Sequence, residues 1–295
     1  MLFRKYTALY NFHMIWKKSK GFISLLRPEL AMAAGICVLA GQVLANQGFP
    51  SLGTAILGFL CGFTLSGAAL ILNDVFDYEV DKINAPQRAL PSGIVTPREA
   101  VIFTAVISLI GLISAGLLGF PVLVVSIIFW IIGILYNWRF KESGLPGNLM
   151  VSASVAITFI LGAMTVHDPW NRIVWIFSAF TFFIDFGEEI AGDAMDLEGD
   201  KQRGSRSLAI LKGKPFALRI TAASWLMVIL ISAIPIVFGW MGFPYLIMIL
   251  LMDGLILFFG YRLLKSTTPA EGRKAMRGVY LGATFGLIGF LLSLL

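Results

Sequence analysis

Nine stretches of about 20 mostly apolar residues occupy most of this chain of 295 residues, and a helix needs about that length to cross a bilayer. Hydrophobic residues make up 58% of the sequence and charged residues 14%, whereas about a quarter of residues are charged in soluble domains. We therefore predict an all-α membrane protein with nine transmembrane helices in one bundle. The stretches cover residues 29–47, 51–75, 99–118, 121–138, 148–166, 171–190, 216–238, 243–264 and 277–295.

The positive charges lie almost entirely on one side of this predicted bundle. When the connecting segments are assigned alternately to the two sides, 22 of the 23 Lys and Arg residues share one side and only Arg172 lies on the other. Such an excess marks the cytoplasmic side, so we predict a multi-pass cell-membrane protein with its N-terminus inside and its C-terminus outside. The basic side suits anionic lipid head groups and phosphorylated ligands, and nucleic acid is not an expected partner.

Residues 1–28 precede the first apolar stretch and mix basic with aromatic side chains. They lack the continuous apolar core of a signal peptide. We predict that this basic amphipathic segment lies along the inner membrane surface, and that residues 29–295 form a single transmembrane domain.

Two acidic segments repeat one pattern at a fixed offset of 119 residues: Asp74, Asp77, Glu79, Asp81 and Lys82 recur as Asp193, Asp196, Glu198, Asp200 and Lys201. On a helix the three Asp positions of each segment, at i, i+3 and i+7, share one face and lie within a few ångströms of one another. Carboxylates that close repel unless a cation lies between them, and oxygen ligands without nearby His or Cys suit magnesium. Each segment is therefore predicted to be a magnesium site.

The repeat also predicts an architecture. Four crossings separate the stretches 51–75 and 171–190, so both helices run in the same direction and both acidic segments lie at cytoplasmic ends. We predict two parallel four-helix repeats plus a ninth helix. A pseudo-twofold axis along the membrane normal would then bring the two acidic faces together.

So many carboxylates around one cavity need countercharge. A diphosphate is bridged by metal ions at such sites, and its remaining charge suits nearby basic residues. In a membrane the natural diphosphate carries an apolar tail, so the predicted ligand is a prenyl diphosphate. The basic residues available to hold it are Arg88, Lys141, Lys201, Arg203 and Arg206.

These motifs resemble a known family. The segment Asn73-Asp74-x-x-Asp77-x-x-x-Asp81, with Asn84-x-Pro86-x-Arg88 and Leu90-Pro91-Ser92-Gly93 after it, resembles the first signature of the UbiA superfamily of intramembrane prenyltransferases. Asp193 with Asp196-x-x-x-Asp200 resembles the second signature. The resemblance extends over nearly the whole chain, including Arg27-Pro28, the segment from Tyr136 to Lys141, and Gly147-Asn148.

The resemblance implies a chemistry and a site. Two or more Mg²⁺ ions bind the diphosphate, the allylic C–O bond ionises, and a lipophilic acceptor captures the prenyl cation. The metal ligands and catalytic carboxylates would be Asn73, Asp74, Asp77, Asp81, Asp193, Asp196 and Asp200. The substrate-binding residues would be Asn73, Arg88, Tyr136, Lys141, Lys201 and Arg206. Tyr78 or Tyr136 is a further possible shield for the cation, although aromatic residues at helix ends are more often interface anchors.

The acceptor stays open. The stretch from Gly144 to Asn148 and the form of the second motif look closest to the archaeal ether-lipid branch, which suggests geranylgeranylglyceryl phosphate. That branch often has Arg-Glu-Ile where this chain has Glu188-Glu189-Ile190, and Asp185 lies one turn earlier. These three acids are candidates for the acceptor side. Prenylation of an aromatic acceptor of the 4-hydroxybenzoate or naphthoate type is the alternative.

A transporter of divalent cations or phospholipid precursors is the alternative outside enzymes, because parallel repeats also suit transport. Transport sites tend to lie near the midplane, whereas both acidic motifs lie at cytoplasmic helix ends, so the position favours an enzyme. Asp253 is different, since it falls near the middle of the stretch 243–264. An ionisable group at that depth is costly, so we expect it either to line the acceptor pocket or to make a structural hydrogen bond.

Overall fold

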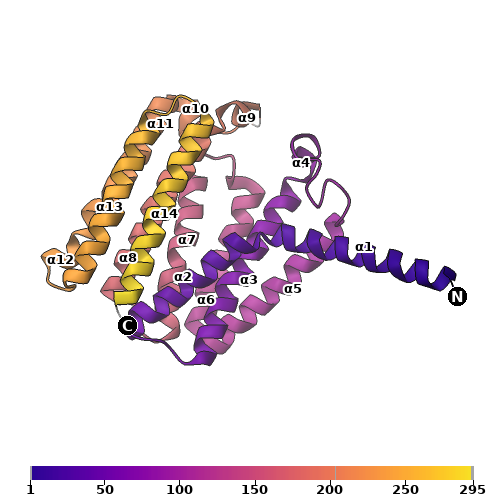
Figure 1. The fold of residues 1–295 in the computed structure, drawn as a ribbon, viewed down its shortest axis with the longest axis horizontal. Helices are drawn as coiled ribbons and strands as arrows, with labels where there is room; N and C mark the ends of the chain where they lie inside the picture. Colours follow the sequence, from indigo (N-terminus) through magenta and orange to yellow (C-terminus); the bar gives the residue numbers. More distant parts are fainter. Residues whose placement is uncertain (1, 203, 294–295) are drawn as a thin grey trace. The chain divides into compact units, whose positions relative to one another are not determined.

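The computed structural model describes residues 2–202 and 204–293, and within these ranges it is built from helices without a strand (Figure 1). Side chains are described for residues 14–201, 204–287 and 290. The helices are α1 (Leu2–Leu26), α2 (Pro28–Asn46), α3 (Leu52–Phe76), α4 (Tyr78–Asn84), α5 (Pro97–Leu118), α6 (Phe120–Leu135), the π-helix η1 (Tyr136–Phe140), α7 (Leu145–Thr165), α8 (Arg172–Met195), α9 (Leu197–Gln202), α10 (Leu208–Lys212), α11 (Lys214–Ser232), α12 (Ile234–Val237), α13 (Phe243–Leu264) and α14 (Pro269–Ser293).

Each of the nine predicted stretches overlaps a long helix or a helix with its short continuation. The last helix, α14, begins at Pro269, before the predicted stretch 277–295, and residues 294–295 lie outside the described residues. Of the described helices, seven are long and apolar enough to cross a membrane: α2, α3, α5, α6 with η1, α7, α11 with α12, and α13. The helices at the other two predicted places, α8 and α14, have 24 and 25 residues but carry more charge. An all-helical membrane protein is therefore confirmed, while the count of nine crossings and the parallel repeat stay predictions.

The chain divides into two compact units, one of residues 1–36 with 56–137 and the other of residues 37–55 with 138–295. In the first unit the end of α1 packs into the core. Leu25 is 1% exposed and lies in one apolar cluster with Ile71 of α3 and with Leu90 of the loop after α4. Gly21 permits this packing, because a Cβ there would lie 2.8 Å from the side chains of Ile94 and Val95. The N-terminal segment is thus helical, and its position on a membrane surface stays a prediction.

The first unit places its acidic motif between α3 and a capped helix. Thr96 begins α5 with a capping box: its hydroxyl accepts a hydrogen bond from the Glu99 N–H at 3.3 Å, and the Glu99 carboxylate accepts one from the Thr96 N–H at 3.0 Å. Such a reciprocal cap fixes the point where a helix starts. Lys18 also forms an ion pair with Glu99, so α1 and the start of α5 are joined.

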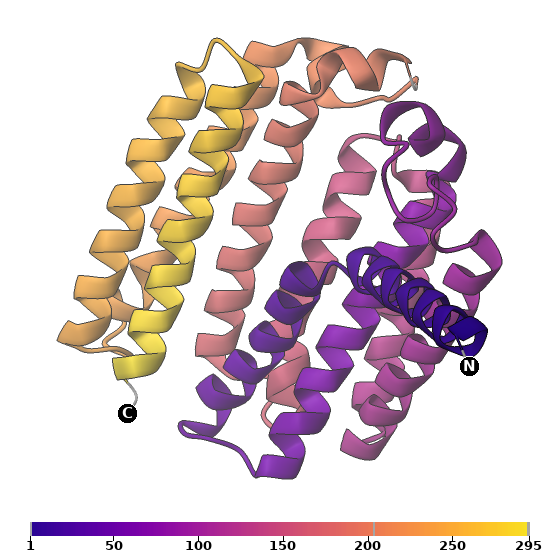
Figure 2. The ribbon, with the colours of Figure 1, turned by 45° about the vertical axis from the view of Figure 1, so that its right-hand side comes forward.

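The second unit is a bundle of α7, α8, α11, α13 and α14, joined by the second half of α2. In this unit α13 and α14 lie side by side (Figures 1 and 2). Trp225 of α11 is 2% exposed and donates a hydrogen bond to the Ile184 carbonyl of α8 at 3.1 Å. Gly187 makes room for the indole, since a Cβ at residue 187 would lie 2.5 Å from its Nε1 atom.

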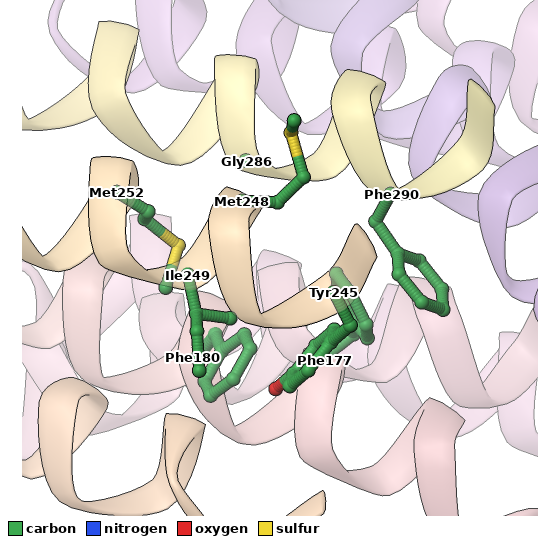
Figure 3. A pocket seen from close by; sticks show the side chains of 8 residues that line it. All are labelled: Phe177, Phe180, Tyr245, Met248, Ile249, Met252, Gly286 and Phe290. Carbon is green, nitrogen blue, oxygen red and sulfur yellow. The ribbon is translucent and has the colours of Figure 1, made fainter. Parts of the chain in front are cut away.

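A small apolar pocket lies between α8, α13 and α14 in the second unit (Figure 3). Its α8 residues, Phe177 and Phe180, lie in the half of that helix remote from the second acidic motif. None of the described residues that line the pocket is charged, so it belongs to the apolar packing of these helices. Its lining residues are Phe177, Phe180, Tyr245, Met248, Ile249, Met252, Gly286 and Phe290.

Candidate active site

The first acidic motif lies where α3 ends. The helix stops at Phe76, Asp77 adopts φ −81° and ψ 0°, and α4 begins at Tyr78. Two backbone hydrogen bonds continue through this interruption, from the Asp77 N–H to the Asn73 carbonyl at 3.0 Å and from the Asp81 N–H to the Asp77 carbonyl at 2.8 Å. The middle Asp of the motif therefore marks a bend between two helices.

The second acidic motif repeats this geometry at the same offset. Here α8 stops at Met195, Asp196 adopts φ −101° and ψ 16°, and α9 begins at Leu197. The Asp196 N–H bonds to the Gly192 carbonyl at 2.9 Å and the Asp200 N–H to the Asp196 carbonyl at 3.0 Å. The repeat seen in the sequence is thus a repeat of backbone structure within each unit.

The bend corrects one expectation. We expected the three Asp of each motif to share the face of one continuous helix, but Asp77 and Asp196 each interrupt it with ψ near 0°. This backbone conformation is sparsely populated and is often found in active sites. Each motif therefore distributes its carboxylates over the end of a long helix, a bend and a short helix.

Arginines hold the outer carboxylates of the first motif. Asp74 and Asp81 are each 5% exposed. Arg27 donates to Asp74, and Arg88 donates to Asp81 at 2.6 Å and lies 3.7 Å from Asp74. Partial desolvation lowers the pKa of Arg88, but the hydrogen bond to Asp81 and the neighbouring carboxylates outweigh it and raise that pKa above its usual value. The Arg88 side chain therefore stays charged.

Arg27 was not among the predicted site residues. It has φ 46°, in the left-handed region that non-glycine residues rarely adopt, and it connects α1 to α2. Such strain persists only where surrounding structure enforces it, and it concentrates at functional sites. The available signal was the Arg27-Pro28 pair, which directly precedes the first apolar stretch.

Hydrogen bonds between side-chain amides hold Asn73, the residue that precedes the first Asp of the motif. The Asn73 side chain donates to Asn137 at 3.0 Å, and Asn137 donates to the carbonyls of Ala69 and Gly133 at 3.2 and 3.0 Å. Asn137 was not among the predicted site residues. It lies in η1 next to Tyr136, and π-helical turns often occur at functional sites.

Polar partners from two other helices hold the second motif. Asn148 at the start of α7 donates to Asp193 at 3.1 Å, and Arg273 of α14 forms an ion pair with Asp196. Asp200 lies in α9 beside Lys201, whose side chain is exposed. Arg273 lies 77 residues from Asp196, so no local spacing indicated this pair.

Two predicted diphosphate ligands lie in loops that contact each other in the second unit. The Arg206 N–H donates to the Glu142 carbonyl at 2.9 Å, one residue from Lys141. Gly144 allows the contact, because it has φ 71° and a Cβ there would lie 2.2 Å from the Arg206 carbonyl oxygen. The loop that follows η1 and the loop that follows α9 are thereby held together, and Arg203 lies outside the described residues.

The donor set suits magnesium, but it forms no closed cage. Among the residues that the structure describes, no three His, Cys, Asp or Glu side chains gather where they could hold a metal ion. This differs from the expected close clusters of carboxylates, and arginines form ion pairs with Asp74, Asp81 and Asp196. Mg²⁺ is usually held by one or two carboxylates together with substrate phosphates and water, so the acidic motifs fit a metal that binds with its diphosphate.

Asp253 makes the structural hydrogen bond that was one of the two expectations. Its carboxylate accepts from the Ser232 hydroxyl at 2.7 Å, and Tyr245 donates to the Ser232 carbonyl at 3.0 Å. These contacts join α11 to α13 and lie apart from both acidic motifs in the sequence. The Asp253 Oδ1 atom is buried without a hydrogen-bond partner among the described residues, but no second acid of the described chain lies beside it, so we assign Asp253 to the contact between α11 and α13.

The sequence matches the model of the UbiA prenyltransferase family over residues 34–293. The chain belongs to this family. Its relatives include digeranylgeranylglyceryl phosphate synthase of Methanopyrus kandleri, which is 32% identical over 276 residues, or 94% of this chain and 100% of the relative. The enzyme of that name from Thermococcus kodakarensis is 29% identical over 274 residues, or 93% and 98% of the two chains.

Solved structures agree with the fold of this UbiA prenyltransferase. A structure of digeranylgeranylglyceryl phosphate synthase has a TM-score of 0.80 at 26% identity and covers 94% of this chain and 98% of its own. A UbiA homologue from Archaeoglobus fulgidus bound to GPP and Mg²⁺ has a TM-score of 0.63 at 20% identity, covering 91% and 99%. The predicted family and prenyl-transfer activity are confirmed, and the protein is a prenyltransferase with several membrane helices.

Proposed function

We propose that this prenyltransferase moves a geranylgeranyl group from geranylgeranyl diphosphate to the free hydroxyl of geranylgeranylglyceryl phosphate and releases diphosphate. The observation that carries the proposal is the duplicated acidic bend at Asp77 and Asp196, on a chain whose helices can cross a membrane. Relatives named digeranylgeranylglyceryl phosphate synthase match 93–94% of the chain and nearly all of their own length, and they support this acceptor.

Magnesium is the proposed cofactor, in two or more ions that serve the same diphosphate. When bound, Mg²⁺ neutralises the leaving diphosphate and so favours ionisation of the allylic C–O bond. The Archaeoglobus fulgidus homologue bound to GPP and Mg²⁺ supports this assignment. The residues proposed to hold the ions are Asn73, Asp74, Asp77, Asp81, Asp193, Asp196 and Asp200.

The arginines paired with the acidic motifs are also suited to bind diphosphate. Arg27, Arg88 and Arg273 neutralise carboxylates that would otherwise repel one another. A guanidinium binds a phosphate through the same paired donors that bind a carboxylate, so these arginines can pass from Asp to diphosphate when the ligand arrives. We propose Arg88, Lys141, Lys201 and Arg206 as diphosphate ligands, with Tyr136 beside the prenyl cation.

The membrane arrangement follows from charge and repeat. We propose nine crossings in two parallel four-helix repeats plus a last helix, with both acidic motifs and the basic α1 segment on the cytoplasmic side. The charge asymmetry, with 22 of 23 Lys and Arg residues on one predicted side, supports this orientation.

A panel of acceptors tests the function. Purified protein in detergent receives labelled geranylgeranyl diphosphate and Mg²⁺ with geranylgeranylglyceryl phosphate, 4-hydroxybenzoate or a dihydroxynaphthoate. The proposal expects a labelled ether lipid and at least a tenfold preference for the glycerol phosphate. Because Glu188 replaces the Arg often seen in the ether-lipid branch, preferential labelling of an aromatic acceptor is the outcome that would replace this proposal with its alternative.

A further inference from the structure

Three carboxylic acids of α8 precede the second acidic motif without sharing its proposed role. Asp185 is 8% exposed, and Glu188 and Glu189 are half-buried. One oxygen of Asp185 accepts a hydrogen bond from the Tyr280 hydroxyl of α14 at 3.4 Å, while its other oxygen, Oδ2, is buried with no hydrogen-bond partner in the described structure. The Ser152 hydroxyl of α7 also lies within hydrogen-bond reach of Asp185, but it donates its one hydrogen to the Asn148 carbonyl at 2.7 Å.

The three carboxylates of this group face fewer hydrogen-bond donors than their oxygens can accept from. The Tyr280 hydroxyl also lies within hydrogen-bond reach of Glu188, but a phenol carries one hydrogen and cannot donate to two carboxylates at once. Lys141 attracts Glu189, the member of the group nearest the second motif in sequence. A buried carboxylate oxygen without a donor is costly, so this group suits a ligand that brings a hydroxyl hydrogen.

The helix sets the distance of the group from the second motif. Asp185, Glu189 and Asp193 are spaced at i, i+4 and i+8 along α8 and so lie along one side of it. At about 1.5 Å per residue, Asp185 lies roughly 12 Å along the helix from Asp193. That separation matches the length of a diphosphate at the motif with the reacting carbon and the acceptor hydroxyl beyond it.

We propose that Asp185, with Tyr280 and Glu188 beside it, binds the hydroxyl of the acceptor and takes its proton; this rests on the function proposed above. The allylic C–O bond breaks and its electron pair leaves with the diphosphate. The acceptor oxygen then bonds to the allylic carbon, and the hydroxyl proton passes to Asp185 Oδ2. The proton later leaves with the diphosphate or to water, which restores the carboxylate.

The test separates capture of the acceptor from binding of the donor. Asp185→Asn keeps the shape of the side chain but cannot take a proton, and positioned bases contribute about 10²–10⁴-fold to rate. We expect kcat for acceptor transfer to fall at least 100-fold, while Mg²⁺-dependent binding of geranylgeranyl diphosphate stays within threefold of the wild type. Asp185→Glu should recover part of the lost rate. Asp253→Asn, which changes a membrane acid outside the group, is the matched control and should transfer at the wild-type rate.

Tyr280→Phe is the second variant, since it removes one hydroxyl from the group and leaves the carboxylates in place. We expect the KM for acceptor to rise about tenfold, with donor binding unchanged. Transfer by Asp185→Asn within threefold of the wild type would overturn the proposal, as would parallel loss of donor binding and transfer. Each variant is assayed with whichever acceptor the wild type uses, so failure of the glycerol phosphate assignment shows in the wild type and failure of this proposal shows in the variants.

Discussion

Arg88 donates a hydrogen bond to Asp81 at 2.6 Å, so a proposed diphosphate ligand is paired with a proposed metal ligand. The same guanidinium lies 3.7 Å from Asp74, which is also bound by Arg27. Two arginines thus form ion pairs with the carboxylates of the first motif. On the proposed function, metal and diphosphate would compete with these ion pairs for the same side chains.

Replacing Arg88 with Ala should weaken donor binding more than it slows the chemical step. A hydrogen bond to a charged group contributes about 1.5–3 kcal/mol, which corresponds to roughly 10–100-fold in KM for prenyl diphosphate. Arg88→Lys should recover part of that loss, because it keeps the charge without the paired donors. Initial rates across a donor titration measure both variants. Loss of kcat with an unchanged KM would argue against a binding role.

Transfer activity should depend on the Asp residues of the acidic motifs and not on their negative charge in general. Asp77→Ala and Asp196→Ala should abolish transfer and Mg²⁺-dependent donor binding, because each removes a proposed metal ligand. Glu79→Ala and Glu198→Ala are matched controls, since these repeated acids are exposed and lie in the same motifs. Chelation by EDTA should stop the wild-type enzyme, and added Mg²⁺ should restore it. Full activity in EDTA would exclude the metal from the reaction.

The sequence predicted the helices well because an apolar stretch of about 20 residues has few other ways to satisfy its backbone in lipid. The stretch 243–264 coincides with α13, and 51–75 differs from α3 by one residue at each end. The repeated Asp positions were also predicted to lie at helix ends, and the structure places them where α3 and α8 end. What the sequence lacked were partners that only the tertiary fold brings near: Arg273, 77 residues from Asp196, and Asn148, 45 residues from Asp193.

The prediction of one continuous helix at each motif was wrong because the sequence pattern does not specify the backbone conformation of the middle Asp. Spacing of i, i+3 and i+7 is compatible with a continuous helix, and the backbone hydrogen bonds of that pattern are indeed present at both motifs. The bend depends on ψ near 0° at Asp77 and Asp196, which side-chain periodicity does not encode.

Accessibility to a membrane-impermeant thiol reagent tests the orientation. In a background without Cys37 and Cys61, we expect a Cys replacing His167 to be labelled from outside intact cells and a Cys replacing Lys212 to be protected. The charge asymmetry predicts this result. Permeabilised cells provide the control, because both positions should then react. The reverse pattern in intact cells would place the acidic motifs on the outer side.

A close contact between α2 and α7 should make Gly162 intolerant of any side chain. A Cβ at Gly162 would lie 2.1 Å from the Val38 carbonyl oxygen, so Gly162→Ala should destabilise the protein by about 1–3 kcal/mol, as overpacking does. Gly254→Ala is the matched control, since nothing lies within 4 Å of a Cβ there and Ala favours a helix. Thermal unfolding in detergent compares the two variants. An equal Tm for both would show that α2 and α7 do not pack this closely.

A double-mutant cycle between the two acidic motifs tests whether both act on one diphosphate. Asp77→Asn, Asp196→Asn and the double variant are compared by initial rate against prenyl diphosphate concentration. If the acidic motifs share the substrate, ionisation fails once either is impaired, and the double variant should be little worse than the slower single variant. Losses that multiply across the two sites, or wild-type transfer by the double variant, would show that the two motifs do not serve one diphosphate.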